Sequence, residues 1–126
     1  MFIKAFTASV TTGEDETGTA YTNAVNGRIL EVAYTKDATA PFTNGVDFVV
    51  TSETTSQAIW SQENVNATAI VRPRQAVHST AGVALNYNDE SDEPVCEPVY
   101  VADERIKIAV AQGGKAKTGA FTVIVG

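Results

Sequence analysis

The sequence has few of the side chains on which most enzymes and disulfide-rich proteins depend. Its 126 residues include one cysteine, Cys96, and one histidine, His78. A single cysteine excludes an intramolecular disulfide, so the chain is not expected to be a small secreted protein held together by disulfides. Most zinc sites and acid–base constellations use several histidines or a cluster of cysteines. We therefore expect a non-enzymatic protein with no catalytic residues, no metal and no cofactor.

Long hydrophobic runs and clustered basic residues are also missing. No apolar stretch approaches the roughly 18 residues that a membrane-spanning helix needs. Nine Lys and Arg are scattered among fifteen Asp and Glu, for a formal net charge of −6, whereas nucleic-acid binding needs clustered positive charge. The first residues lack the apolar core of a signal peptide. The sequence thus predicts a protein that folds in the cytoplasm and binds neither membrane nor nucleic acid.

Leu and Met, the usual fillers of helical cores, are scarce, with 2 Leu and 1 Met against 16 Val, 7 Ile and 16 Thr. Branching at Cβ restricts the side chain in a helix and suits the pleated surface of a sheet. Short segments of alternating polarity, separated by turn residues, recur along one domain spanning 1–126. The sequence therefore predicts an all-β fold: an antiparallel two-sheet sandwich or small barrel of about eight strands, with a jelly-roll among the strand orders that fit.

Four segments show the clearest alternation, and Trp60 is expected to be a core residue. In the first, Leu30, Val32 and Tyr34 are predicted to face inward together. The inward positions of the other three are Val46, Phe48 and Val50; Ile106, Ile108 and Val110; and Phe121, Val123 and Val125. The last two segments flank the glycine-rich stretch 112–119, and together they predict an antiparallel hairpin.

Three segments show no pattern of burial. Residues 11–21 predict a flexible polar loop, and 88–93 predict a solvated acidic loop tip that lacks the glycine of an EF-hand-type calcium loop. Residues 74–87 have no clear period, and a short helix and an extended loop both fit. Because a loop without its own burial pattern can order against a neighbour, 11–21 and 74–87 are the candidate interface segments.

Two arginines flank a rigid proline in Arg72-Pro73-Arg74. Arginine is the preferred residue for planar, bidentate contacts at interfaces. The two guanidinium groups are expected either to contact carboxylates of a partner or to pair with the acidic loop of the same chain. Arg72, Arg74, Gln75 and His78 are the candidate interface residues, and His78 is expected to have a structural or interface role rather than a catalytic one.

Several short motifs resemble those of small structural proteins of tailed bacteriophages, often encoded near the major capsid protein. The resemblance covers residues 25–125. It rests on Asn44-Gly45-Val46-Asp47-Phe48, Trp60, Asn64-Val65-Asn66-Ala67, Pro73-Arg74-Gln75, His78, Arg105-Ile106-Lys107-Ile108, Gln112-Gly113-Gly114 and Lys117-Thr118-Gly119. In several such proteins the role is that of a head decoration, or cement, protein that clamps neighbouring capsomers.

The resemblance implies a partner, a location and an assembly state. The partner would be the major capsid protein, whose lattice the chain would bind and stabilise at the capsid surface of the virion, after assembly in the host cytoplasm. A homo-oligomer, dimer or trimer, is expected through exposed strand edges. The alternatives are a head–tail or tail structural component, and a glycan-binding β-sandwich of a host-recognition structure.

Overall fold

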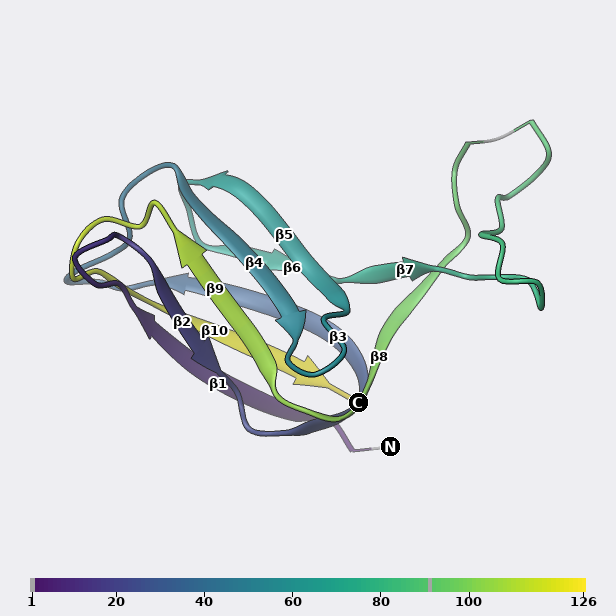
Figure 1. Ribbon diagram of the computed structural model, residues 1–126, viewed down its shortest axis with the longest axis horizontal. Helices are drawn as coiled ribbons and strands as arrows, with labels where there is room; N and C mark the ends of the chain where they lie inside the picture. The colour runs from purple at the N-terminus through teal and green to yellow at the C-terminus, as the bar shows by residue number, and fades with distance from the viewer. Residues whose placement is uncertain (1, 91) are drawn as a thin grey trace.

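Two antiparallel β-sheets pack face to face in the computed structural model, which describes residues 2–90 and 92–126 (Figure 1). Within these residues the chain forms ten strands and no helix. The described residues therefore include no helix that could cross a membrane. The sheets form a sandwich and do not close into a barrel. The all-β sandwich prediction is therefore confirmed. Ser91, in the predicted acidic loop, lies outside the described residues.

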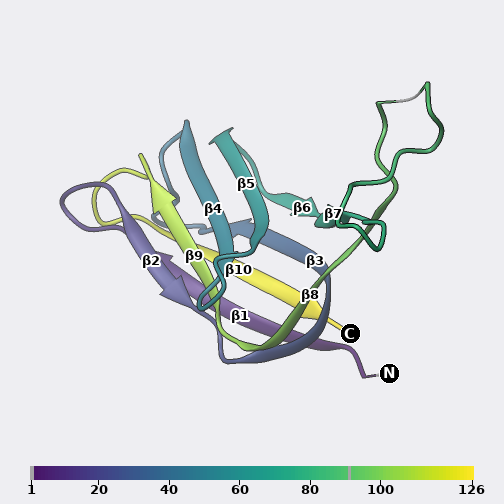
Figure 2. The ribbon, with the colours of Figure 1, turned by 45° about the vertical axis from the view of Figure 1, so that its right-hand side comes forward.

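The larger sheet has the order β1-β10-β3-β8-β7, with β6 also pairing with β3, and the smaller has the order β2-β9-β4-β5. The larger sheet consists of β1 (Lys4–Thr11), β3 (Val25–Lys36), β6 (Ala69–Val71), β7 (Arg74–Ala76), β8 (Cys96–Glu104) and β10 (Thr118–Val125). The smaller consists of β2 (Gly18–Tyr21), β4 (Val46–Ser52), β5 (Ala58–Val65) and β9 (Ile106–Ala111). Figure 2 shows the two layers from a second direction.

Eight of these strands pair as in a jelly roll. When the short β6 and β7 are set aside, the first strand in chain order pairs with the eighth, the second with the seventh, the third with the sixth and the fourth with the fifth. The predicted hairpin of β9 with β10 is therefore wrong. The two strands lie in opposite sheets, because the glycine-rich connection crosses the sandwich instead of turning back within one sheet.

The core consists of the inward side chains of both sheets, including every inward position predicted for β4, β9 and β10. At its centre the Tyr34 ring lies 4.6 Å from the Phe48 ring and 5.2 Å from the Phe121 ring, centroid to centroid. Trp60 is buried, as predicted, with its ring 5.7 Å from that of Phe48. Such edge-on aromatic contacts add to the burial of apolar area. The rings therefore hold the two sheets together.

The inward face of β3 differs from the prediction at Leu30. The register between β3 and β10 shifts here: Glu31 pairs with Ile124, whereas Ile29 pairs with the next residue, Val125. Leu30 is the extra residue of this bulge and is half-buried, while Ile29 is fully buried. A bulge inserts one extra residue into a strand, so the alternation of inward and outward side chains shifts by one position across it.

The loop predicted over 11–21 is shorter than expected. Gly18–Tyr21 is β2, which pairs with β9, so only the turn 12–17 joins β1 to β2. The turn is held by the buried Thr12, whose Oγ1 donates to the carbonyl of Gly114 at 2.5 Å and accepts from the amide of Lys117 at 2.9 Å. Gly18 and Ala20 are too small to give an apolar alternation, which explains why the strand was missed.

Candidate functional site

A long excursion leaves the sandwich between β7 and β8 (Figures 1 and 2). We call residues 77–95 the arm. The strands at its base pair antiparallel, with Arg74 opposite Pro98 and Ala76 opposite Cys96. Both views show the arm standing clear of the two sheets. The segment 74–87, for which a helix and an extended loop were both open, is therefore a short strand followed by irregular extended chain.

Backbone hydrogen bonds at three positions fix the root of the arm. The amide of Val77 donates to the carbonyl of Val95, that of Val95 to Leu85, and that of Leu85 back to Val77, each at 2.9 Å. Beyond this ring lie two loops: a tight one, in which the amide of Ser79 donates to the carbonyl of Val83, and a wider one closed by the amide of Tyr87 and the carbonyl of Glu93. The arm thus takes its shape from its own main chain.

The described residues of the arm have no core of their own. Val77, Ser79 and Val95 are half-buried and all the others are exposed. Val83, Leu85 and Tyr87 have 62%, 40% and 68% of their surface exposed. The chain curls around a hollow of about 510 Å³ lined by residues 84–89. Isolated loops seldom present several apolar side chains to water without a partner, so this is the strongest candidate for an interaction surface.

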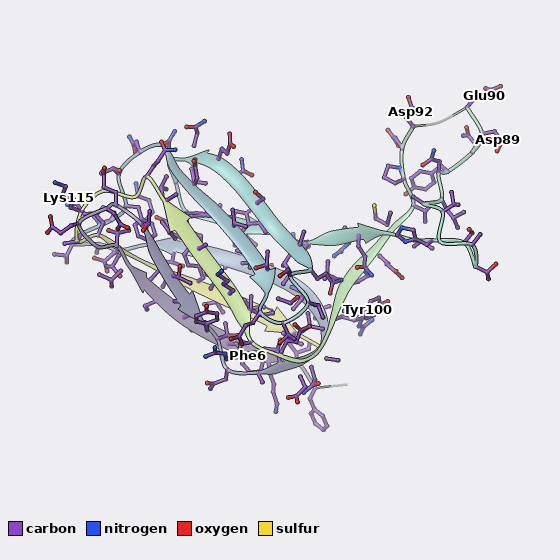
Figure 3. All side chains as sticks on the ribbon, viewed as in Figure 1. Phe6, Asp89, Glu90, Asp92, Tyr100 and Lys115 are labelled. Atoms are coloured by element: carbon purple, nitrogen blue, oxygen red, sulfur yellow. The ribbon has the colours of Figure 1, made fainter. Side chains whose placement is uncertain are left out.

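The outer loop of the arm carries acidic side chains. Asp89, Glu90 and Asp92 extend from its far end, as Figure 3 shows, while Lys115 lies at the opposite end of the molecule. All three carboxylates are exposed. The surface therefore joins an apolar inner part to an acidic rim, as predicted for 88–93.

A chain of amide side chains ties the base of the arm to the sandwich. Gln57, in the β4–β5 turn, donates from Nε2 to Oε1 of Gln75 in β7 at 2.9 Å, and Gln75 donates from Nε2 to Oε1 of Glu97 in β8 at 3.2 Å. Pro73, just before β7, is buried. These contacts set the direction in which β7 and β8 leave the sheet.

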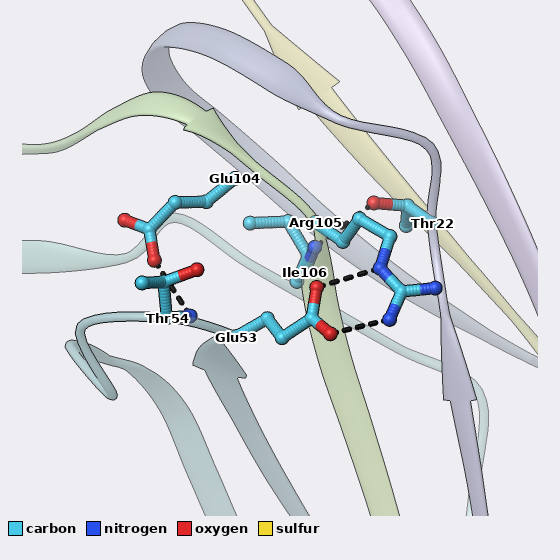
Figure 4. A network of polar contacts seen from close by, with 6 residues as sticks. All are labelled: Thr22, Glu53, Thr54, Glu104, Arg105 and Ile106. Carbon is cyan, nitrogen blue, oxygen red and sulfur yellow. Dashed lines mark hydrogen bonds and ion pairs between the residues drawn. The ribbon is translucent and has the colours of Figure 1, made fainter.

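The turn that holds Gln57 is itself fixed by carboxylates (Figure 4). Glu104 Oε1 accepts hydrogen bonds from the backbone amides of Thr54 and Thr55, both at 2.8 Å. Glu53 forms a bidentate ion pair with Arg105, and the Arg105 guanidinium lies 4.2 Å above the centre of the Tyr21 ring. This corner network, Glu53, Thr54, Thr55, Glu104 and Arg105, joins the β4–β5 turn to the start of β9 and the end of β2.

The corner network favours charged carboxylates. The hydrogen bonds and charge of Arg105 lower the pKa of Glu53, and the amide of Thr55 is the largest cause that lowers the pKa of Glu104. A general acid requires the opposite shift, toward a protonated carboxyl at neutral pH. The arrangement therefore fits a rigid corner that orients the arm.

The four residues predicted to form an interface have different environments. Arg72 lies 3.4 Å from Glu31 of β3, so it pairs within the chain, but with the sheet and not with the acidic loop. Arg74 is exposed, and its Nη1 donates to the carbonyl of Pro73 at 2.9 Å. Gln75 belongs to the base of the arm. His78 is exposed, and its backbone forms an isolated antiparallel β-bridge with that of Ala84, inside the arm.

The sequence indicated where the arm would be but not which of its residues matter. The sequence does not single out Val83, Leu85 and Tyr87 as a contact surface, because isolated apolar residues in a loop show no period. Throughout 2–90 and 92–126, no group of three or more His, Cys, Asp and Glu could hold a metal ion. The described residues of the arm present exposed apolar side chains and negative charge to solvent.

Comparison with known proteins identifies no family. No family model matches the sequence, and no curated protein matches it. A solved structure described as "Crystal Structure of FLHE" is similar over 99% of this chain and 98% of that chain, with 13% sequence identity and a TM-score of 0.49. Similarity at this level carries no argument about function.

Proposed function

We propose that this chain is a non-enzymatic structural protein of a tailed-phage virion, and that it decorates the head by docking its arm on the lattice of the major capsid protein. One observation carries the proposal: the arm presents Val83, Leu85 and Tyr87 to solvent while its base is held by the sandwich. A decoration protein requires a rigid scaffold and an exposed contact surface. The sequence resemblance to phage structural proteins supports the choice of partner.

The acidic rim indicates the character of the surface on which the arm would dock. The exposed Asp89, Glu90 and Asp92 favour a partner with Lys or Arg around an apolar depression, because complementary charge steers the encounter and fixes the register. Apolar side chains at the centre of a contact contribute most of its affinity. We therefore place Leu85 and Tyr87 at the centre of the interface and the carboxylates at its edge.

Co-sedimentation tests the proposal, with undecorated heads assembled from the major capsid protein of the phage that encodes the chain. The unaltered protein should bind until the sites are saturated, and the double variant L85S/Y87S should lose binding by roughly a hundredfold or more, as expected when two central contacts are removed. The matched control is I70S/Y100S, which removes two side chains of similar exposure, 59% and 49%, from the sandwich.

Each outcome decides between functions. No co-sedimentation of the unaltered protein overturns the capsid role, and loss of binding in I70S/Y100S but not in L85S/Y87S overturns the role of the arm. Labelled protein found on tails would instead indicate a head–tail or tail component. Retention on bacterial surface polysaccharide, lost in L85S/Y87S, would indicate a glycan-binding module.

A further inference from the structure

The outer strands of the two sheets differ in how well they are protected against pairing with another chain. An unpaired edge strand presents backbone N–H and C=O groups on which another strand can add, and proteins usually blunt such edges with short strands, bulges or charge. β2 has four residues, and β6 and β7 have three each. β5 is longer, but its pairing with β4 shifts register twice, it carries Glu63, and Asn64 has a positive φ of 54°. These outer strands are therefore blunted.

The edge formed by β1 is longer and regular, and its single charged residue, Lys4, is the first of the strand. Among the described residues β1 pairs only with β10, through eight consecutive positions from Lys4–Val125 to Thr11–Thr118 without a shift in register. Between Lys4 and the end of the strand every residue is uncharged, and the sequence holds neither Pro nor Gly. A regular, uncharged strand of this length is the kind of edge that accepts another strand.

The direction of the free backbone groups follows from the hydrogen bond after β1. The amide of Thr12 donates to the carbonyl of Lys117 at 2.8 Å, which continues the β1–β10 ladder by one position. In an antiparallel pair, alternate residues bond to the same neighbour. Even-numbered residues of β1 therefore bond to β10, and the N–H and C=O groups of Ala5, Thr7 and Ser9 point outward.

The end of β1 is covered, which limits the open edge. Gly18 of β2 lies so close that a Cβ at this position would be 2.7 Å from the carbonyl oxygen of Thr11. The open edge thus runs from Ala5 to Ser9. Ala5, Thr7 and Ser9 are all exposed, and their side chains are small.

We propose that the open edge of β1 pairs antiparallel with the same edge of a second copy, across a two-fold axis at Thr7. In this register Thr7 faces its own copy and Ala5 faces Ser9, so the outward N–H and C=O groups of all three residues find partners. The two Lys4 side chains then lie about 20 Å apart, at roughly 3.4 Å per residue, beyond the Debye length at physiological salt. The larger sheets of the two copies become one continuous sheet.

A second copy fits this edge better than an unrelated peptide because the open stretch is self-complementary when two copies pair antiparallel. The chain carries a net charge of −6, so two copies repel each other overall, whereas the open edge brings no like charges into contact. The dimer uses a different part of the molecule from the arm and does not depend on the proposed capsid role.

Thr7→Pro and Thr7→Val test the proposal as a matched pair. Both remove the hydroxyl of Thr7, which lies 3.2 Å from that of Thr122, but only proline removes the outward N–H, without breaking a bond to β10. In sedimentation equilibrium, the unaltered protein and T7V should dimerise alike. The dimerisation of T7P should be weaker by roughly tenfold or more, because each dimer loses two hydrogen-bond donors.

Hydrogen exchange gives a readout that needs no variant. The amides of Ala5, Thr7 and Ser9 should exchange more slowly as the concentration of the unaltered protein rises, while the amides on the outer edge of β5 should not change. A monomeric protein up to its solubility limit, equal dimerisation by T7P, or concentration-independent exchange at these three amides overturns the proposal. T7P should still bind undecorated heads and L85S/Y87S should still dimerise, so the dimer and the capsid role can fail separately.

Discussion

The side-chain amide of Gln57 donates a hydrogen bond to the side-chain oxygen of Gln75, at 2.9 Å. The first residue belongs to the β4–β5 turn of the smaller sheet, and the second to β7, at the base of the arm. This contact joins the arm to a corner that Glu104 and Arg105 already hold in place. The base of the arm is therefore held by the sandwich, while residues beyond Val77 depend on a few backbone hydrogen bonds of their own.

Limited proteolysis should distinguish these two regions. Thermolysin cleaves before bulky apolar residues, and we expect its first cuts at Val83 and Leu85, because exposed chain with few hydrogen bonds opens locally at little cost. Mass spectrometry should find two fragments that stay together through the sheets. First cuts within β3 or β10 would contradict the separation of arm and sandwich.

Replacing Tyr34 with Phe should stabilise the protein. The Tyr34 hydroxyl is buried, and no other described residue forms a hydrogen bond with it, so removing it should raise the free energy of unfolding by about 1 kcal/mol. Urea unfolding measures the change, with Tyr100→Phe, at an exposed ring, as the control that should show almost none. A Y34F protein less stable than the unaltered one would mean that the hydroxyl is satisfied.

The same side chain predicts a response to alkaline pH. Burial raises the pKa of Tyr34 above its usual value of 10.0. Above that value the unfolded chain loses the tyrosine proton while the folded protein keeps it, so stability should fall as the pH rises. The fall should be shallower in Y34F than in the unaltered protein, and equal slopes in urea titrations would count against this explanation.

Gly119 should not tolerate a side chain. A Cβ at this position would lie 2.5 Å from a ring carbon of Phe42 and 2.8 Å from one of Tyr34. Gly119→Ala should therefore cost about 1–3 kcal/mol through overpacking. Gly13→Ala is the control, because a Cβ there would meet only the Asp15 carboxylate at 3.5 Å. Similar thermal unfolding midpoints for the two variants would refute the expectation.

Acid should weaken the corner network. The pKa values of Glu53 and Glu104 are both lowered from the usual 4.5. Such a group stabilises the fold above its unfolded value, and the contribution is lost as the pH falls through the lower, folded value. The variant E53Q/E104Q should therefore be less stable than the unaltered protein near neutral pH. The two unfolding curves should converge as the pH drops well below 4.5, and a constant difference at every pH would argue against the network.

The fold was predictable wherever burial alternated regularly. The inward sides of β4, β9 and β10 follow directly from period-two alternation, because one face of each strand meets the core. The alternation does not say which strand lies beside which, so it suggested a β9–β10 hairpin when the chain in fact crosses between sheets. It also cannot reveal an inserted residue, and the bulge at Leu30 puts Ile29, instead of Leu30, on the inward face.

The candidate site was predictable only as a region. The missing period over 74–87 correctly indicated chain outside the core, but its shape depends on Val95, whose backbone meets Val77 and Leu85 from the other end of the arm. Arg72 was expected at an interface because of its chemistry, and Gln75 was a candidate beside it. Their partners, Glu31 and Gln57, lie on other strands and turns, and only the folded chain brings them together.

The paired exit of β7 and β8 also offers a place where a foreign peptide could be inserted. Arg74 faces Pro98 where the two strands depart, so whatever is spliced between them begins and finishes at neighbouring points, and its length places no strain on the jelly roll. An epitope or fluorophore-binding sequence inserted beside Gly82, where a side chain would find open space, would be displayed well away from the body of the molecule.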